Sequence, residues 1–449
     1  MRWPTLLLLL LTATSHAAEP TLHVPYERYR LPNGLVVILH EDHRLPQVVV
    51  DVWFRVGSKD ERVKRTGFAH LFEHLMFMGT KNVPNGQFDQ IMESEGGSNN
   101  ASTSEDRTNY FDLGPSNLLE TFLYLEADRL ATLPDAMNKQ KVDLQRDVVK
   151  NERRQSYENR PYGKVGLVLP ENLYPLNHPY HHPVIGSHAD LTAASVEDVK
   201  AFFRSNYVPS NASLVIAGDF KTDEARRLVD KYFAWMPLAP EPPHVVPPPA
   251  ELAKNQRVLL KDHVQLEQVT LAWHSPVLLG AGDAEYQLLS ALLGGGKSSR
   301  LQKALVYEKK LAQEVRVEQE GNRYDGNFVI TATAQPGHSA VELEKAIDEE
   351  LAALDGKAPP TEREVERARA FTETQLLQQL GPLFGLADSL NEHEFICGDP
   401  GELERSTLAR FSKLGASDLA WASHSLVARP RLTVVVQPDG KAAKEKAHE

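Results

Sequence analysis

Two histidines and a glutamate in one short segment, His70, Glu73 and His74, have the types and the spacing to do chemistry. In a helix, residues four positions apart lie on one face, about 5–6 Å apart at their Cβ atoms. That separation lets both imidazoles bind one tetrahedral zinc ion. Glu73 then lies beside the metal without binding it, where its carboxylate can take a proton from the attacking water. The spacing therefore predicts a zinc-dependent hydrolytic site with Glu73 as general base.

A buried helix is expected to carry these three residues. Thr66 can cap its start and Gly79 can end it, which places the helix over residues 67–78. Apolar side chains surround the helix on most sides: Phe68, Leu71, Phe72, Leu75, Met76 and Phe77. Polar groups in such a helix are costly unless they find partners, and either a metal ion or a histidine–glutamate pairing in the core would satisfy them. The capped, otherwise apolar helix favours the metal.

A zinc site with two histidines needs a third protein ligand, and its fourth position is left to water. The best candidate is Glu152, because it ends a stripe of residues with the spacing of a core-facing helix face: Gln145, Val148, Val149 and Glu152. A carboxylate at the end of that stripe points inward and needs a partner. A salt bridge from Glu152 to Arg153 or Arg154 is the alternative. The rival carboxylates end no comparable stripe: Glu93, Glu95, Glu105 and Glu126.

Other reactive residues give weaker signals. Four histidines fall in a segment rich in proline and glycine, where a hydrogen-bonded loop is favoured over a second metal site or a metal-storage role: His178, His181, His182 and His188. The run from Gly294 to Ser299 resembles a phosphate-binding loop only loosely, and a loop between helices is the better interpretation. Cys397 is the only cysteine, so no internal disulfide can form, and we expect a buried, inert thiol.

The composition is that of a globular protein with more than one domain. The chain has 449 residues, of which 41% are hydrophobic and 24% charged, and its formal net charge of −12 argues against a nucleic-acid partner. Residues 1–18 combine Arg2, a leucine run and small residues at their end, which predicts a cleaved signal peptide. An uncleaved anchor is the alternative. No later stretch predicts a membrane span, so the mature protein is expected to be exported, in the periplasm.

The mature chain divides into two halves of similar pattern. Prolines are concentrated in residues 237–252, which predicts an extended linker between an N-terminal domain at 19–236 and a C-terminal domain at 253–440, followed by a charged tail at 441–449. Each half opens with strand-like runs, continues with an apolar helix and long helical stretches, and ends in a β-branched strand. This order predicts an α+β class with two homologous domains, each an antiparallel-rich sheet packed with helices.

Several segments resemble the pitrilysin/insulysin family of zinc peptidases, in particular its shorter members similar to mitochondrial processing peptidase. The most specific match is the segment from Gly67 to His74 with Met78-Gly79-Thr80, whose H-x-x-E-H order is typical of inverzincins. Further matches are residues 31–35, 100–103, 108, 110, 151–154, 294–296 and 298–301. The resemblance implies one zinc per chain, two domains that enclose a chamber, and hydrolysis of unfolded peptides. It also implies that an edge strand at Asn100 and Ala101 binds the peptide as an added strand.

Two departures from the family pattern matter. Gln145 stands where the family often has an acidic residue, and its amide can hydrogen-bond a ligand histidine but carries no charge. Val306 and Gln313 stand where catalytic members have an arginine and a tyrosine that contact the substrate. A partner is therefore expected, a homologous exported chain that supplies the arginine–tyrosine pair in a heterodimer. The alternatives are a monomer or homodimer of weak activity, and a non-catalytic peptide-binding or assembly subunit with a structural zinc.

Overall fold

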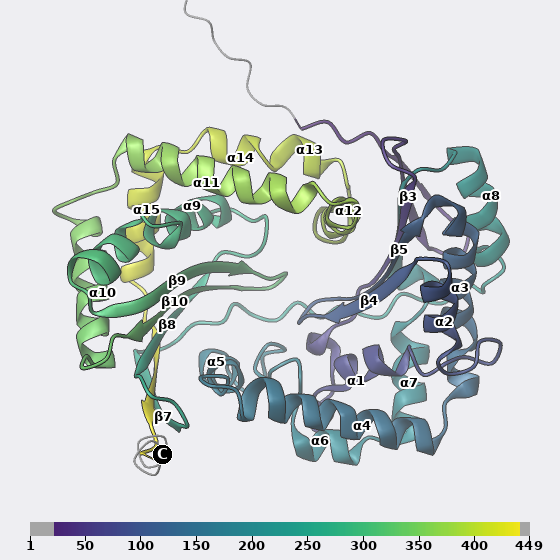
Figure 1. Cartoon of the computed structure of the whole chain (residues 1–449), viewed down its shortest axis with the longest axis horizontal. Coiled ribbons are helices and arrows are strands. Elements are labelled where there is room, and N and C mark those ends of the chain that lie inside the picture. Colours follow the sequence, from purple (N-terminus) through teal and green to yellow (C-terminus); the bar gives the residue numbers. More distant parts are fainter. Residues whose placement is uncertain (1–21, 441–449) are drawn as a thin grey trace, which may run out of the picture.

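Two β-sheets with helices packed on them make up the protein in a computed structural model that describes residues 22–440. The predicted α+β class is confirmed (Figure 1). The predicted signal peptide at 1–18 and charged tail at 441–449 lie outside the described residues. Within residues 22–440, no helix has the length and apolar character needed to cross a membrane.

The N-terminal sheet has six strands in the order β1-β2-β6-β3-β5-β4. Strands β2 and β6 are parallel, and all other neighbouring pairs are antiparallel. The central strands are buried runs of valine, isoleucine and leucine, as expected for strands covered on both faces. Their bounds are β1 Glu27–Arg30, β2 Val36–Glu41, β3 Gln47–Phe54, β4 Ser98–Thr103, β5 Thr108–Pro115 and β6 Ala212–Gly218. Strand β4 has a free edge, as predicted for the segment at Asn100.

The C-terminal sheet has five strands in the order β7-β11-β8-β10-β9. Only β7 and β11 are parallel. The strands are β7 Gln256–Asp262, β8 Gln268–Ser275, β9 Ala312–Gly321, β10 Gly326–Ala334 and β11 Leu432–Pro438. This order repeats that of β2, β6, β3, β5 and β4 with the same pattern of directions, so the two halves share one topology. Strands β9 and β10 were not among the strands expected from the sequence.

The helices of the N-terminal half are α1 Phe68–Leu75, α2 Gln87–Ser94, α3 Leu119–Ala136, α4 Lys139–Arg153, α5 Val165–Leu173, α6 His188–Ala193, α7 Val196–Asn206 and α8 Thr222–Phe233. Those of the C-terminal half are α9 Asp283–Gly294, α10 Ala340–Asp355, α11 Glu362–Leu380, α12 Leu383–Cys397, α13 Glu402–Ser406, α14 Ala409–Ser412 and α15 Ala416–Val427. Helices α1, α3, α4, α9 and α11 match helical stretches expected from the sequence, with shifted ends, and the other helices were not expected. A π-helical turn, Arg154–Glu158, continues α4. Residues 237–252 form neither helix nor strand.

One helix of each half packs on the sheet of the other half. Helix α12 packs on β3 and β6, and its Leu386 and Leu390 share an apolar cluster with Val36, Ile38 and Val215 of the N-terminal sheet. Helix α5 packs on β8 and β11, in a cluster that joins its Leu173 to strands of the C-terminal sheet. Figure 1 shows the two sheets on opposite sides of the molecule, with α12 lying against the N-terminal one. The halves are therefore packed together through reciprocal contacts.

Two expectations about burial are wrong. Val148 was expected on the core-facing stripe of α4 but is 41% exposed. An α-helix has about 3.6 residues per turn. The inner face of α4 therefore runs through Val142 and Val149, which are buried, and Val148 lies to one side of it. Cys397 was expected to be buried but is exposed. It is the last residue of α12, where the chain turns away at Gly398 with a left-handed φ of 72°.

Candidate active site and metal centre

Helix α1 begins at a glycine that fits a tight contact. Gly67 has a φ of 87°, and a Cβ atom there would meet the carbonyl oxygen of Ile185 at 2.8 Å. The first amides of the helix donate to the buried carboxylate of Glu61, from Gly67 at 2.8 Å and from Ala69 at 2.7 Å. The predicted cap by Thr66 is wrong, because its hydroxyl donates to Asp190 instead. An acidic residue outside the helix thus satisfies the amides at its start.

The helix buries its apolar side chains and turns its polar ones to a more open side. Phe68, Leu71 and Leu75 are buried, as predicted. The imidazoles of His70 and His74 remain 13% and 24% exposed. The helix ends at Leu75, earlier than predicted, and the chain reaches the left-handed Gly79 through a turn. The three polar residues therefore lie on a face that a ligand can reach.

The structure brings the three predicted metal ligands together. The Nε2 atoms of His70 and His74 lie 3.3 Å apart. One carboxylate oxygen of Glu152, on α4, lies 3.3 Å from Nε2 of His74 and 3.7 Å from Nε2 of His70. Ligand atoms about 2.1 Å from a tetrahedral ion are about 3.4 Å from one another. The nearly equilateral triangle of one carboxylate oxygen and two imidazole nitrogens therefore fits zinc, and among residues 22–440 no other group of histidines, cysteines and carboxylates converges in this way.

The electrostatics of the triad favour a bound cation. Burial lowers the pKa of His70 to about 4, so its ring is neutral and can offer a lone pair. A hydrogen bond from His74 lowers the pKa of Glu152, which keeps that carboxylate ionised. Burial also acts to lower the pKa of His74, but its hydrogen bond to Glu152 and the charge of Glu73 outweigh it and raise that pKa. Neutral imidazole and ionised carboxylate are the forms that bind zinc.

Glu73 lies beside the triad without joining it. Its carboxylate accepts a hydrogen bond of 2.5 Å from the hydroxyl of Thr103, the last residue of β4. Burial raises the pKa of Glu73, which moves this carboxylate toward the range of a useful general base. Thr103 lies in a segment with family resemblance, but its contact with Glu73 could not be expected from spacing, because thirty residues separate the two.

The free edge of β4 carries the two predicted substrate-binding residues. The amide N–H of Ala101 donates to the side-chain oxygen of Asn100 at 2.8 Å. Strand β4 pairs only with β5 and contacts α1. A backbone donor at a free edge, next to the glutamate and the metal triad, can accept an extended peptide as a further strand.

Comparison with known proteins identifies the family. The family description "Insulinase (Peptidase family M16)" matches residues 36–178, and "Peptidase M16 inactive domain" matches residues 193–371. The zinc protease PqqE of Helicobacter pylori is 32% identical over 381 residues, which cover 84% of each chain. The chain belongs to peptidase family M16. The resemblance to the pitrilysin/insulysin family is thereby confirmed.

Solved structures of M16 proteins share the fold. The crystal structure of a protease from Helicobacter pylori superposes with a TM-score of 0.85 at 29% identity, covering 92% of this chain and 100% of that chain. The periplasmic protease PqqL from Escherichia coli superposes with a TM-score of 0.77 at 20% identity, a likeness of fold alone. This chain covers 49% of PqqL, so the longer protein has room for a second unit of this size.

The rival assignments for the third ligand find other partners. Arg153 pairs with Glu158 at 3.0 Å rather than with Glu152. Glu126 forms a buried ion pair with Arg129. Among the described residues, neither Glu93, Glu95 nor Glu105 joins the metal group. Gln145 lies where expected, on the inner face of α4, with hydrogen-bond contacts to His74 and to the sulfur of Met78. An amide therefore lies beside the predicted ligand His74.

In the C-terminal half, no group of histidines, cysteines and carboxylates within residues 253–440 converges as the triad does. Val306 lies half-buried in a π-helical turn, Gln302–Glu308, and packs against the core of its own half. Gln313 is exposed near the start of β9. The rings of the four histidines after α5 contact protein groups, as in the hydrogen bond of His181 with the carbonyl of Tyr174 and that of His188, the first residue of α6, with Glu158. These histidines do not form a second metal group among the residues described.

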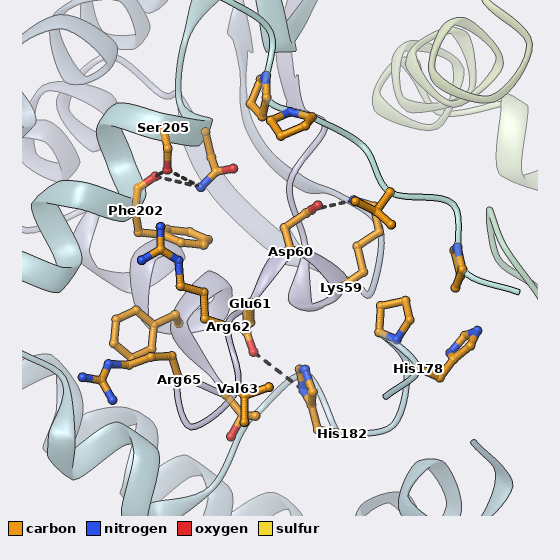
Figure 2. A pocket seen from close by; sticks show the side chains of 18 of the residues that line it. Lys59, Asp60, Glu61, Arg62, Val63, Arg65, His178, His182, Phe202 and Ser205 are labelled. Atoms are coloured by element: carbon orange, nitrogen blue, oxygen red, sulfur yellow. Dashed lines mark hydrogen bonds and ion pairs between the residues drawn. The ribbon is translucent and has the colours of Figure 1, made fainter. Parts of the chain in front are cut away.

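A cavity of ≈ 860 Å³ lies near the start of α1, away from the metal triad. Figure 2 shows its wall of charged side chains, with Glu61 close to His182 and Lys59 paired with Asp60. Its rim exposes apolar side chains, among them Val63 at 89% and Leu176 at 84%. None of the three ligands or Glu73 lines it. The convergence of ligand atoms, rather than the size of a cavity, locates the candidate active site.

Proposed function

We propose that this M16 protein is an exported zinc endopeptidase that hydrolyses unfolded peptides. One observation supports this above all: the Nε2 atoms of His70 and His74 and a Glu152 oxygen form a triangle with sides of 3.3 to 3.7 Å, with Glu73 beside it. Its relatives named zinc proteases agree with this chemistry. The periplasmic location stated for PqqL supports export of a chain that begins with a signal-like segment.

The roles of the residues follow from their positions. His70, His74 and Glu152 would hold one zinc ion, which when bound lowers the pKa of water and polarises a carbonyl. Glu73 accepts the proton of the attacking water and passes it to the amine of the leaving peptide. Burial has raised the pKa of Glu73, so its carboxylate holds a proton more readily between these two transfers.

Strand β4 would position the substrate. An extended peptide pairs with the free edge through backbone groups, and the N–H of Ala101 then exchanges the side chain of Asn100 for a peptide carbonyl. Pairing of this kind requires an unfolded segment, since a folded protein offers few free backbone groups. The edge leads to Thr103 and Glu73, so the bound strand runs past the catalytic base.

A second candidate function is that of a peptide-binding or assembly subunit in which zinc is structural. Val306, Gln313 and Gln145 favour it, because none of them carries the group that catalytic family members usually have at its position. The match of residues 193–371 to an "inactive domain" is consistent with either function, since the metal triad lies in the other half. A closed site with four protein ligands would support this candidate.

A heterodimer with a homologous chain would account both for the zinc site of this chain and for its missing arginine and tyrosine. A homologous exported chain could supply the arginine and tyrosine that Val306 and Gln313 replace, and this chain would supply the zinc. PqqL, about half of which this chain covers, offers a precedent of size for two such units in one protein.

Cleavage of a fluorogenic peptide library tests the proposal. We expect the purified chain, with about one zinc bound, to cleave peptides and to lose this activity to a chelator and recover it with zinc. Co-expression with a homologous chain encoded beside it should raise the rate if the heterodimer forms. Stoichiometric zinc without cleavage, alone or with that homologue, would favour the structural-zinc function instead.

A further inference from the structure

We propose that helix α12, lent by the C-terminal half, positions strand β4 and through it the catalytic carboxylate, with Asp388 as the positioning residue. The proposal rests on the function proposed for Glu73. It assigns to the C-terminal half a task in the reaction that needs neither the missing arginine nor the missing tyrosine. The connection consists of hydrogen bonds from α12 to Ser102 of β4, the backbone from Ser102 to Thr103, and the hydrogen bond from Thr103 to Glu73 of α1.

The series starts on the face of the sheet that α12 covers. One carboxylate oxygen of Asp388, Oδ1, accepts from the indole N–H of Trp53 on β3 at 2.9 Å and from the amide of Asn109 on β5 at 3.0 Å. Trp53 is 3% and Asn109 1% exposed. Hydrogen bonds in such buried surroundings are electrostatically stronger than those exposed to water. Asp388 therefore fixes the side-chain direction of Asn109.

The next steps lead from β5 to the edge strand. Ser102 lies opposite Asn109 in the register of β4 and β5, and its hydroxyl donates to the Asn109 side-chain oxygen at 2.7 Å. Arg107 donates to the Ser102 hydroxyl at 2.5 Å and to the Ser102 carbonyl at 2.9 Å. The guanidinium of Arg107 lies 4.9 Å from the ring centre of Trp53. Arg107 donates to Ser102, Ser102 donates to Asn109, and Asn109 donates to Asp388.

The last step reaches the candidate base. Thr103 follows Ser102 in β4 and donates to Glu73. An edge strand has a neighbour on one side only, so its backbone is held less firmly than that of an inner strand. The carbonyl and hydroxyl of Ser102, both held by Arg107, anchor β4 on one side of Thr103, and the N–H of Ser104, which donates to the carbonyl of Arg107 at 2.9 Å, anchors it on the other. Loss of Asp388 should loosen β4 where it aligns a peptide and holds the carboxylate.

Helix α12 offers a matched control. Glu394 lies about 1.7 turns further along α12, is 1% exposed, and accepts two hydrogen bonds from Arg28 of β1 at 2.7 and 2.8 Å. It joins the same helix to the same sheet, but at the edge opposite β4. Glu394→Gln should therefore destabilise the contact between the halves without affecting β4.

The experiment compares Asp388→Ala, Asp388→Asn and Glu394→Gln in the full chain. Amide hydrogen exchange of residues 98–103 is measured in zinc-free protein, and zinc content, kcat and KM are measured in zinc-loaded protein. We expect Asp388→Ala to speed exchange in β4 about tenfold and to lower kcat/KM about tenfold to hundredfold with zinc retained. Asp388→Asn should stay near wild type, because its side-chain oxygen accepts the same two hydrogen bonds. Glu394→Gln should leave β4 exchange unchanged.

Two outcomes would overturn the proposal. One is unchanged exchange in β4 for Asp388→Ala in a folded protein. The other is equal acceleration in Asp388→Ala and Glu394→Gln, which would make the contact a general stabiliser of the fold. Because hydrogen exchange requires neither zinc nor turnover, it tests the positioning even if the wild-type chain cleaves nothing. In that case the proposed function fails, while the link from α12 to β4 stands or falls on exchange alone.

Discussion

The two halves share one sheet topology but use the helix that follows the second common strand, β3 or β8, in opposite ways. In the N-terminal half this helix is α1, which has eight residues and leaves His70, Glu73 and His74 on an accessible face. In the C-terminal half it is α9, which has twelve residues and buries most of them in the core. The same position in the fold therefore carries the candidate metal ligands in one half and core packing in the other. The two helices differ both in length and in the polar side chains of α1.

The edge strands differ in a related way. Strand β4 ends beside the metal triad and is anchored through Ser102. Strand β9 starts next to the turn that holds Val306, and its Gln313 is exposed. One edge is thus equipped for a reaction, whereas the other lacks the groups that would complete it. The predictions below test how far the division of labour extends.

Replacing the third ligand should have the largest effect on the N-terminal half. We expect Glu152→Ala to lose zinc, because two imidazoles alone bind it far more weakly than three ligands do. Arg153→Ala is the matched control, since Arg153 pairs with Glu158 and not with the triad. Metal content after dialysis checks both. Stoichiometric zinc in Glu152→Ala would show that another carboxylate completes the site.

Introducing the missing arginine and tyrosine tests the C-terminal half. The double variant Val306→Arg with Gln313→Tyr should raise peptide cleavage by the isolated chain about tenfold or more, if both side chains reach the transition state. Cleavage kinetics of the double variant and wild type, each without a partner, provide the measurement. A wild-type chain already fully active, with no gain in the variant, would remove the reason for a heterodimer.

A smaller effect is expected beside the ligand histidine. Gln145→Ala removes an amide that lies against His74, and zinc affinity should fall about tenfold because outer contacts orient metal ligands. Competition with a chromogenic chelator measures the affinity. Leu144→Ala, at an exposed neighbouring position of α4, serves as control. Equal affinities in all three proteins would mean that Gln145 does not orient His74.

The smallest effect is expected at the free edge. Asn100→Ala removes the side chain that occupies the N–H of Ala101 before a peptide binds. We expect KM to change only about twofold to threefold and kcat to stay constant, since the backbone supplies the pairing groups. Steady-state kinetics with a single fluorogenic peptide suffice. A large fall in kcat would instead place Asn100 at the reacting bond.

The sequence predicted which side chains converge in the triad because helical spacing is a local property. His70 and His74 share a helix face because they are four residues apart. Glu152 ends the inner face of α4, which the spacing of apolar residues predicted except at Val148. Val148 was expected to face the core because it lies three residues after Gln145. At about 3.6 residues per turn, that position falls outside the buried face of α4. The duplication was also visible, since buried strands of valine and leucine recur in the same order.

Contacts between distant segments could not be predicted. The hydrogen bond from Thr103 to Glu73 and the packing of α12 on the N-terminal sheet both depend on how the chain returns to itself. The polar, charged pattern of β9 hid that strand, because only one of its faces is buried and its edge is free. One chain without relatives to compare carries no signal for such pairs.

The most direct test of the account is a comparison of wild type with Glu73→Gln for zinc content and for peptide cleavage. Glutamine keeps the size of the side chain and can still accept from Thr103, but it cannot take a proton. The account predicts about one zinc in both proteins and a loss of cleavage of about 10²-fold to 10⁴-fold in the variant. Full cleavage by Glu73→Gln with zinc bound would contradict the account, because the reaction would then not depend on the carboxylate beside the triad.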